Sequence, residues 1–245
     1  MQSKSILRGA LQLAVLASVL DGNPVRDVQP LRSKNQPKGA VALTANQLRD
    51  LLVKLQTSEF CAKHDLVDPI TLLVATGLRR SELLGLRWKD FDEKGGMLTI
   101  TDKVIRVPGE GCLQRVDETK SAAGWRTIPL PRFAIETLQN RRLLPYLGEQ
   151  AVIFPSTAGT LRDPNNLAKE WRAAREELGV ANATTHSFRK AIATLIDDEG
   201  LSARIGADHL GHSHVSMTQD RYMTRGRIHT QVADLLDRTV RINDE

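Results

Sequence analysis

Residues 76–83 read Thr-Gly-Leu-Arg-Arg-Ser-Glu-Leu and lie between two segments of helical pattern. Because helices commonly end at glycine, we expect one helix to stop at Gly77 and another, over 81–86, to follow Arg79. Arg79 and Glu82 are three residues apart, so both side chains can point one way from the start of that helix. A guanidinium binds two phosphate oxygens at once, and Glu82 can orient it. An isolated Arg-x-x-Glu is more often a surface ion pair.

A second polar pair begins an apolar helical pattern at 186–189, which reads His-Ser-Phe-Arg. Thr184 or Thr185 can cap this helix. His186 and Arg189 are then expected to face out from the helix mouth, where the helix dipole also favours an anion. His-x-x-Arg is a weak motif when it stands alone.

The string Leu-Gly-His at 210–212 ends a third helical pattern at a glycine. His212 can there donate a hydrogen bond to a phosphate oxygen, although a lone surface histidine is the ordinary interpretation. Tyr222 follows ten residues later in polar surroundings, and Tyr146, the other tyrosine of the chain, is interpreted as a packing residue. A phenol needs activation to act as a nucleophile, and clustered cations lower the cost of forming phenolate.

Lys120 lies in Thr-Lys-Ser at 119–121, just before the strand-like Trp-Arg-Thr-Ile-Pro-Leu of 125–130. This position is the expected tip of a hairpin, where a lysine is usually only solvated. Lys103 is a rival cation, but it lies within an expected strand.

Strand character is confined to the middle of the chain, at 97–107, 113–118 and 125–130, with turn residues between these segments. Thr44 is expected to cap a helix that extends to about Leu55. Further helices are expected at 70–75, 81–86, 133–143, 164–178, 187–198, 201–208, 214–221 and 229–238. The sequence therefore predicts a mainly α fold with a small three-stranded antiparallel sheet.

The order and spacing of these motifs resemble the tyrosine recombinase, or phage integrase, family from about Leu43 onward. The resemblance implies the catalytic fold of that family, of the DNA breaking-rejoining type. It implies a supporting role for Glu82 and a catalytic set composed of Arg79, Lys120, His186, Arg189, His212 and Tyr222. Tyr222 would attack a DNA phosphate to form a 3′-phosphotyrosyl bond, and Lys120 would protonate the departing 5′ oxygen. No metal or cofactor is required. Family members often carry a second histidine where this chain has Lys190.

The first 43 residues differ in character from the rest. A helix over 5–20 has an apolar face, and residues 1–20 resemble a remnant last helix of the family's core-binding domain. Residues 21–43 read as a basic, proline-rich linker, and 44–245 as the catalytic domain with a C-terminal tail helix. The linker cations suited to a phosphate backbone are Arg26, Arg32, Lys34 and Lys38. A solvated surface loop is the alternative, and a signal peptide at the N-terminus lacks a clean cleavage site.

Composition limits the class of partner. A net charge of +5 and a pI of about 9.4 favour a polyanion. Residues 1–40 hold six basic and two acidic side chains, so the remainder is nearly neutral and must gather its cations on one face to bind DNA. The two cysteines offer neither a disulfide framework nor a metal cluster and fit a reducing cytoplasm. No apolar run is long enough to span a bilayer.

The resemblance thus implies a cytoplasmic, nucleoid-associated site-specific recombinase that acts on double-stranded DNA attachment sites, as in the integration of a viral genome. It further implies a homotetramer on DNA that exchanges its C-terminal tail between protomers, with an accessory DNA-bending protein as a further partner. Packing of the tail on its own domain remains the alternative. Two other functions stay open, namely DNA relaxation like that of a type IB topoisomerase and non-catalytic DNA binding by a decayed integrase.

Overall fold

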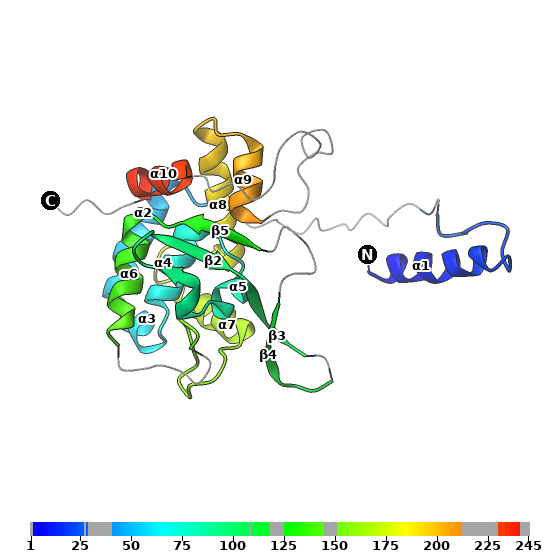
Figure 1. The fold of residues 1–245 in the computed structure, drawn as a ribbon, viewed down its shortest axis with the longest axis horizontal. Coiled ribbons are helices and arrows are strands. Elements are labelled where there is room, and N and C mark those ends of the chain that lie inside the picture. Colours follow the sequence, from blue (N-terminus) through cyan, green and yellow to red (C-terminus); the bar gives the residue numbers. More distant parts are fainter. Residues whose placement is uncertain are drawn as a thin grey trace. The chain divides into compact units, whose positions relative to one another are not determined.

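The computed structural model describes residues 2–26, 28, 41–107, 109–117, 125–144, 151–211 and 230–240 (Figure 1). The chain divides into two compact units, Met1–Gly39 and Ala40–Glu245. In the first unit, helix α1 spans Gln2–Leu16 and so ends four residues before the predicted limit. The Asn23 side chain folds the following segment back on α1 by donating to the Arg8 carbonyl at 2.9 Å.

The second unit begins with three helices, α2 (Ala45–Thr57), α3 (Glu59–Lys63) and α4 (Val67–Thr76). Thr44 caps α2 as predicted, because its hydroxyl accepts from the Gln47 N–H while the Gln47 side chain accepts from the Thr44 N–H. Helix α3 was not predicted. Its five residues are too few for a helical repeat to show in the sequence.

The strands form two sheets. Strands β1 (Phe91–Asp92), β2 (Met97–Ile100) and β5 (Arg126–Pro129) pair antiparallel in the order β1-β2-β5. Strands β3 (Asp102–Arg106) and β4 (Leu113–Asp117) form a separate hairpin. The fold class is confirmed, but the predicted continuous strand 97–107 is wrong. It breaks at Thr101, because Arg115 of β4 pairs with Asp102 and donates to the Gly85 carbonyl at 2.7 Å. These contacts hold β3 against helix α5 (Arg80–Gly85) rather than against β5.

The remaining elements are helical. They are the short η1 (Trp88–Asp90), α6 (Arg132–Arg142), α7 (Pro164–Ala174), α8 (Thr185–Asp198), α9 (Ala203–Leu210) and α10 (Thr230–Val240). The predicted helix 214–221 lies outside the described residues. Among the described helices, none combines the length and apolar character needed to cross a membrane.

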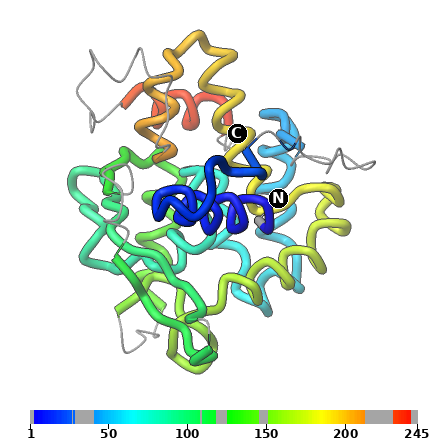
Figure 2. The backbone as a smooth tube through the Cα atoms, turned by 90° about the vertical axis from the view of Figure 1, so that its right-hand side faces the viewer, coloured from blue at the N-terminus to red at the C-terminus, as the bar shows by residue number. Residues whose placement is uncertain are grey.

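Helix α4 forms the centre of the core, and Ile70, Leu72 and Leu73 on it are fully buried. It packs against α2, α5, α6 and α8, and α8 lies beside α9 (Figure 2). As a result the end of α4 and the end of α9 both meet the first turns of α8.

Helix α10 packs on its own unit, against α2, α6 and β5. Val232, Leu235, Leu236 and Val240 are buried, which matches the predicted apolar spacing. Asp237 accepts a hydrogen bond from the backbone N–H of Arg132 at 2.7 Å and so caps the first turn of α6. In this single chain, the tail helix therefore packs against the domain to which it belongs.

Replacing Gly77 by Ala should destabilise the fold more than replacing Gly200 by Ala. Both glycines have a positive φ, 63° and 68°, where a Cβ costs about 1–2 kcal/mol. A Cβ at Gly77 would also lie 2.7 Å from Leu210 Cδ2 and 3.1 Å from Ile192 Cδ1, whereas at Gly200 it would meet nothing within 4 Å. Urea unfolding midpoints measure the difference, and equal losses would contradict the close approach of α4 to α8 and α9.

Candidate active site

Four elements bring their ends together around one carboxylate. The loop after α4 supplies Arg79, the first turn of α5 supplies Glu82, β5 supplies Arg126, and the first turn of α8 supplies Arg189. The end of α9 adds backbone carbonyls. We call Arg79, Arg126 and Arg189, together with Glu82, the arginine cluster.

Arg79 is anchored by its neighbours and remains partly exposed. It is the N-cap residue of α5, and its N–H donates to Oε2 of Glu82 at 3.1 Å. Its guanidinium pairs with Oε1 of Glu82 and donates to the Gly211 carbonyl at 3.4 Å. Glu82 is fully buried, while the Arg79 side chain is 43% exposed. The predicted contact between Glu82 and Arg79 is therefore present, and a large part of the Arg79 side chain is exposed among the described residues.

Arg189 is buried, not exposed at the helix mouth as predicted. Its side chain is 3% exposed and donates to the carbonyls of Gly77, at 3.0 Å, and Leu210. These carbonyls lie at the C-terminal ends of α4 and α9, where backbone acceptors lack helical partners and the helix dipoles are negative. Helix ends remote in sequence thus draw Arg189 inward, and the sequence pattern of α8 alone could not reveal them.

Arg126 joins the cluster although the sequence analysis assigned it no role. Its Nη2 lies 2.8 Å from Oε2 of Glu82, and its Nε donates to the His209 carbonyl at 3.0 Å. A signal for it was present in the sequence, since strand alternation places Arg126 on the same face as Ile128, and both are buried. A charged residue on an inward face requires a charged or polar partner.

The cluster carries more positive than negative charge. Burial alone would raise the pKa of Glu82, but the guanidiniums of Arg126 and Arg79 outweigh it and lower that pKa, so Glu82 is a carboxylate at neutral pH. The pKa of Arg189 is lowered to about 10, chiefly by burial and also by the charges of Arg79 and Arg126. The charge of Glu82 acts in the opposite direction. Among the described residues of the cluster, three guanidiniums face one carboxylate. A bound anion would relieve that imbalance.

His186 lies in the first turn of α8, exposed beside the cluster. Its pKa is lowered by partial burial of the ring and by the charges of Arg189, Arg79 and Lys190. The imidazole is therefore largely neutral at pH 7 and able to accept a proton. Lys190, which stands where family members often carry a second histidine, is one of the charges acting on His186.

A pH titration by NMR should place the midpoint of His186 below that of the same histidine in the urea-unfolded chain. Folding favours the neutral imidazole, so this contribution to stability is fully present above the unfolded pKa and is lost as the pH falls from that value through the lower, folded pKa. Inorganic phosphate should raise the midpoint, because an anion beside Arg79 offsets the positive charge. A midpoint unmoved by both folding and phosphate would contradict an anion site here.

The other predicted catalytic residues, Lys120, His212 and Tyr222, lie outside the described residues, as do Arg32, Lys34 and Lys38 of the linker. Gly211, which precedes His212, ends α9 in the left-handed conformation and contributes its carbonyl to Arg79. Arg26 lies in the first unit, and its backbone N–H donates to the Asn23 carbonyl at 3.0 Å. The rival Lys103 lies on β3 of the separate hairpin.

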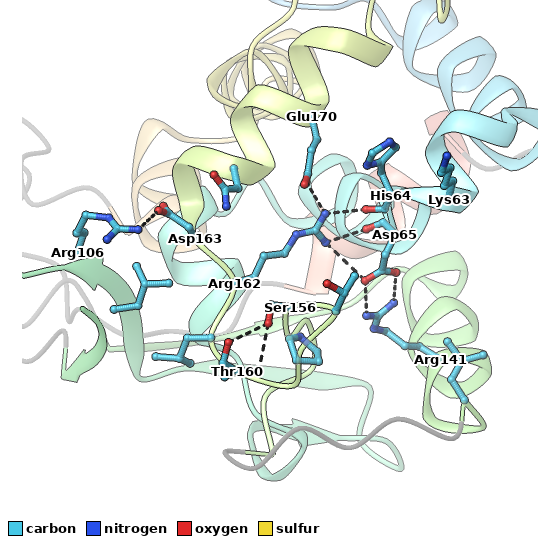
Figure 3. A pocket seen from close by; sticks show the side chains of 16 residues that line it. Lys63, His64, Asp65, Arg106, Arg141, Ser156, Thr160, Arg162, Asp163 and Glu170 are labelled. Atoms are coloured by element: carbon cyan, nitrogen blue, oxygen red, sulfur yellow. Dashed lines mark hydrogen bonds and ion pairs between the residues drawn. The ribbon is translucent and has the colours of Figure 1, made fainter. Parts of the chain in front are cut away.

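A pocket of about 580 Å³ lies elsewhere, between α3, the β3-β4 hairpin and the loop before α7 (Figure 3). Its three arginines pair with acids, as Arg162 pairs with Glu170 at 2.7 Å and Arg141 with Asp65 at 2.8 Å. These ion pairs mark it as a structural network. Among the described residues, no group of three or more His, Cys, Asp or Glu side chains is placed to hold a metal ion.

Known proteins share both sequence and fold with this chain. Residues 42–226 match the model of the phage integrase family. A XerC-like tyrosine recombinase of Caldanaerobacter subterraneus is 28% identical over 179 residues, which are 65% of this chain and 45% of that protein. The chain spans about half the length of the curated relatives it matches.

Two solved structures extend the likeness to the fold. The Tn1549 transposon integrase in complex with circular intermediate DNA is 25% identical, with a TM-score of 0.72 over 91% of this chain and 74% of that one. A lambda integrase tetramer bound to a Holliday junction has 20% identity and a TM-score of 0.55, over 91% of this chain and 59% of that one.

Proposed function

The chain belongs to the phage integrase family, and from that premise we propose that it is a site-specific DNA recombinase working through a 3′-phosphotyrosyl intermediate. The observation that supports this most is the arginine cluster, which holds a partly exposed Arg79 near His186 and carries an excess of positive charge. Such donors, held in place before substrate arrives, suit the charge that develops on a phosphate under attack.

The chemistry follows from this arrangement and from the resemblance. The Tyr222 oxygen bonds to phosphorus, its proton passes to neutral His186, and Lys120 protonates the departing 5′ oxygen. Arg79 and His212 would donate hydrogen bonds to the pentacovalent phosphate, and the buried Arg189 would stabilise it through its positive charge. The phosphotyrosyl bond keeps the energy of the broken phosphodiester, so a 5′ hydroxyl of a partner duplex can reverse the reaction without a metal or cofactor.

The proposed substrate is double-stranded DNA carrying attachment sites, bound in the cell's cytoplasm beside its nucleoid. The neighbouring structures of the Tn1549 and lambda integrases are DNA complexes, and the lambda structure is a tetramer. Residues 44–245 would form the catalytic domain, 21–43 a DNA-tracking linker with Arg26, Arg32, Lys34 and Lys38, and 1–20 the last helix of a core-binding domain. An accessory DNA-bending protein is a further expected partner.

A nicked suicide duplex tests the proposal. The protein should form a covalent complex that persists on a denaturing gel, because the released strand diffuses away and religation fails. Protein that binds the duplex without forming such a complex, under conditions where a related recombinase does form one on its own site, would refute the activity.

Assembly is proposed to move the tail helix from its own domain to a neighbouring protomer. A chain ending at residue 229 lacks α10, and a full-length Tyr222→Phe chain lacks the nucleophile. Neither should form adduct alone, but a mixture should, because the full-length chain lends its α10 while the shortened chain supplies Tyr222. A mixture as inactive as its components would contradict exchange of the tail.

A further inference from the structure

Arg126 is buried deeply for a charged residue that starts a strand. It is 7% exposed, and it directly follows Trp125, which is 53% exposed. Burying a guanidinium costs free energy unless its donors are satisfied. It donates to a carboxylate on α5 and to a carbonyl at the end of α9, so it connects β5 to the two helix ends on which Arg79 also depends.

Glu82 divides its two oxygens between the arginines. Oε1 pairs with the Arg79 guanidinium, while Oε2 lies 2.8 Å from Arg126 Nη2 and 3.1 Å from the Arg79 N–H. Arg126 thus sets the rotation of the carboxylate group, and that rotation decides where Oε1 meets Arg79. Arg79 is the exposed member of this chain of contacts, with 43% of its side chain accessible. Arg126 would therefore act on a ligand only through Glu82 and Arg79.

We propose that Arg126 is a positioning residue of the phosphate site, which fixes Glu82 as an oriented carboxylate and through it aligns the guanidinium of Arg79. The inference rests on the proposed function, since the alignment matters for a DNA phosphate. It also predicts a property of the protein without DNA, namely the protonation state of Glu82.

The charges around Glu82 make this dependence strong. Arg79 faces it from the N-cap of α5, Arg126 from β5, and Arg189 acts on it from α8. Burial opposes the charged form, and Arg126 is the largest of the influences that lower the pKa of Glu82. Without Arg126, Glu82 should take up a proton at higher pH, and a neutral acid holds a guanidinium less firmly.

Three variants separate this role from folding. Arg126→Gln removes the charge, and Arg126→Lys keeps it with fewer donors. Arg141→Gln is the matched control, since Arg141 is a buried guanidinium, 8% exposed, that pairs with Asp65 (Figure 3). It also pairs with Asp68 and donates to the Ile153 carbonyl at 2.7 Å. Loss of Arg141 should lower the unfolding midpoint without altering the cluster.

The readouts are the carboxyl titration of Glu82 by ¹³C NMR in the DNA-free protein and the pH profile of single-turnover adduct formation. In Arg126→Gln, Glu82 should titrate at higher pH than in the wild type and the acidic limb of the profile should move the same way. The rate at pH 7 should fall about 10- to 100-fold, the range shown by outer partners of metal ligands, with DNA affinity little changed. Arg126→Lys should reverse part of the Glu82 titration shift and restore part of the rate, and Arg141→Gln should match the wild type in both quantities.

The two proposals fail in different ways. If the wild type forms no adduct, the proposed function is refuted. The Glu82 titration still tests the role of Arg126 in that case. An unmoved Glu82 titration in both Arg126 variants overturns the positioning role even when the wild type is active. So does an Arg126→Gln rate profile that follows the wild type or the Arg141→Gln control.

Discussion

Replacing Tyr222 by Phe is expected to abolish the covalent protein–DNA complex while leaving DNA affinity nearly unchanged. Only the nucleophilic oxygen is removed, and the cations that hold the phosphate remain. The loss should be complete within detection, because phenylalanine has no oxygen with which to attack the phosphate. A suicide-duplex gel and a fluorescence-anisotropy titration on the same samples measure the two quantities.

Tyr146→Phe is the matched control, since it removes the hydroxyl of the chain's other tyrosine. It should form the complex at the wild-type rate. Adduct in the Tyr222→Phe variant, or its loss in Tyr146→Phe alone, would assign the nucleophile elsewhere.

Replacing Arg189 by Ala should slow adduct formation about 10²- to 10³-fold, as loss of an oxyanion-stabilising donor does in other enzymes. The variant loses a charge from the cluster and leaves the carbonyls of Gly77 and Leu210 without this donor. DNA affinity should fall much less, because the ground-state phosphate keeps its other cations. Single-turnover rates at saturating protein separate the chemical step from binding.

Destabilisation must be distinguished from lost chemistry, since each buried acceptor left unpaired costs about 1–3 kcal/mol. Arg162→Ala supplies the comparison, because Arg162 is also buried and donates to the backbone carbonyls of Asp65, at 2.9 Å, and His64, at 2.8 Å. It should lose stability but keep its rate per folded molecule. An Arg189→Ala rate no lower than that of Arg162→Ala would remove Arg189 from the chemistry.

Local signals were enough to predict most helices. Thr44 as a cap and the glycines at 77 and 211 act within a few residues, so the sequence predicts where α2 begins and where α4 and α9 end. The spacing of Val232, Leu235 and Leu236 likewise predicts the buried face of α10. The family itself was evident because several short motifs stand in a fixed order, and the family match over 42–226 confirms it.

Long-range contacts account for what the sequence did not predict. The strand 97–107 breaks because Arg115 and Gly85 hold β3 away from β5. Arg189 turns inward toward carbonyls whose positions depend on α4 and α9 packing against α8. The role of Arg126 depends on its contact with Glu82, which is 44 residues away in sequence. No pattern within one helix or strand contains these relationships.

The most direct test of the account is to identify the atom that carries the DNA. The covalent complex should be formed in EDTA, digested with protease and nuclease, and analysed by tandem mass spectrometry. The account predicts a single nucleotide linked through its 3′ phosphate to the phenolic oxygen of Tyr222. Linkage to another residue, linkage through a 5′ phosphate, or a complex that forms only with added metal ion would contradict it.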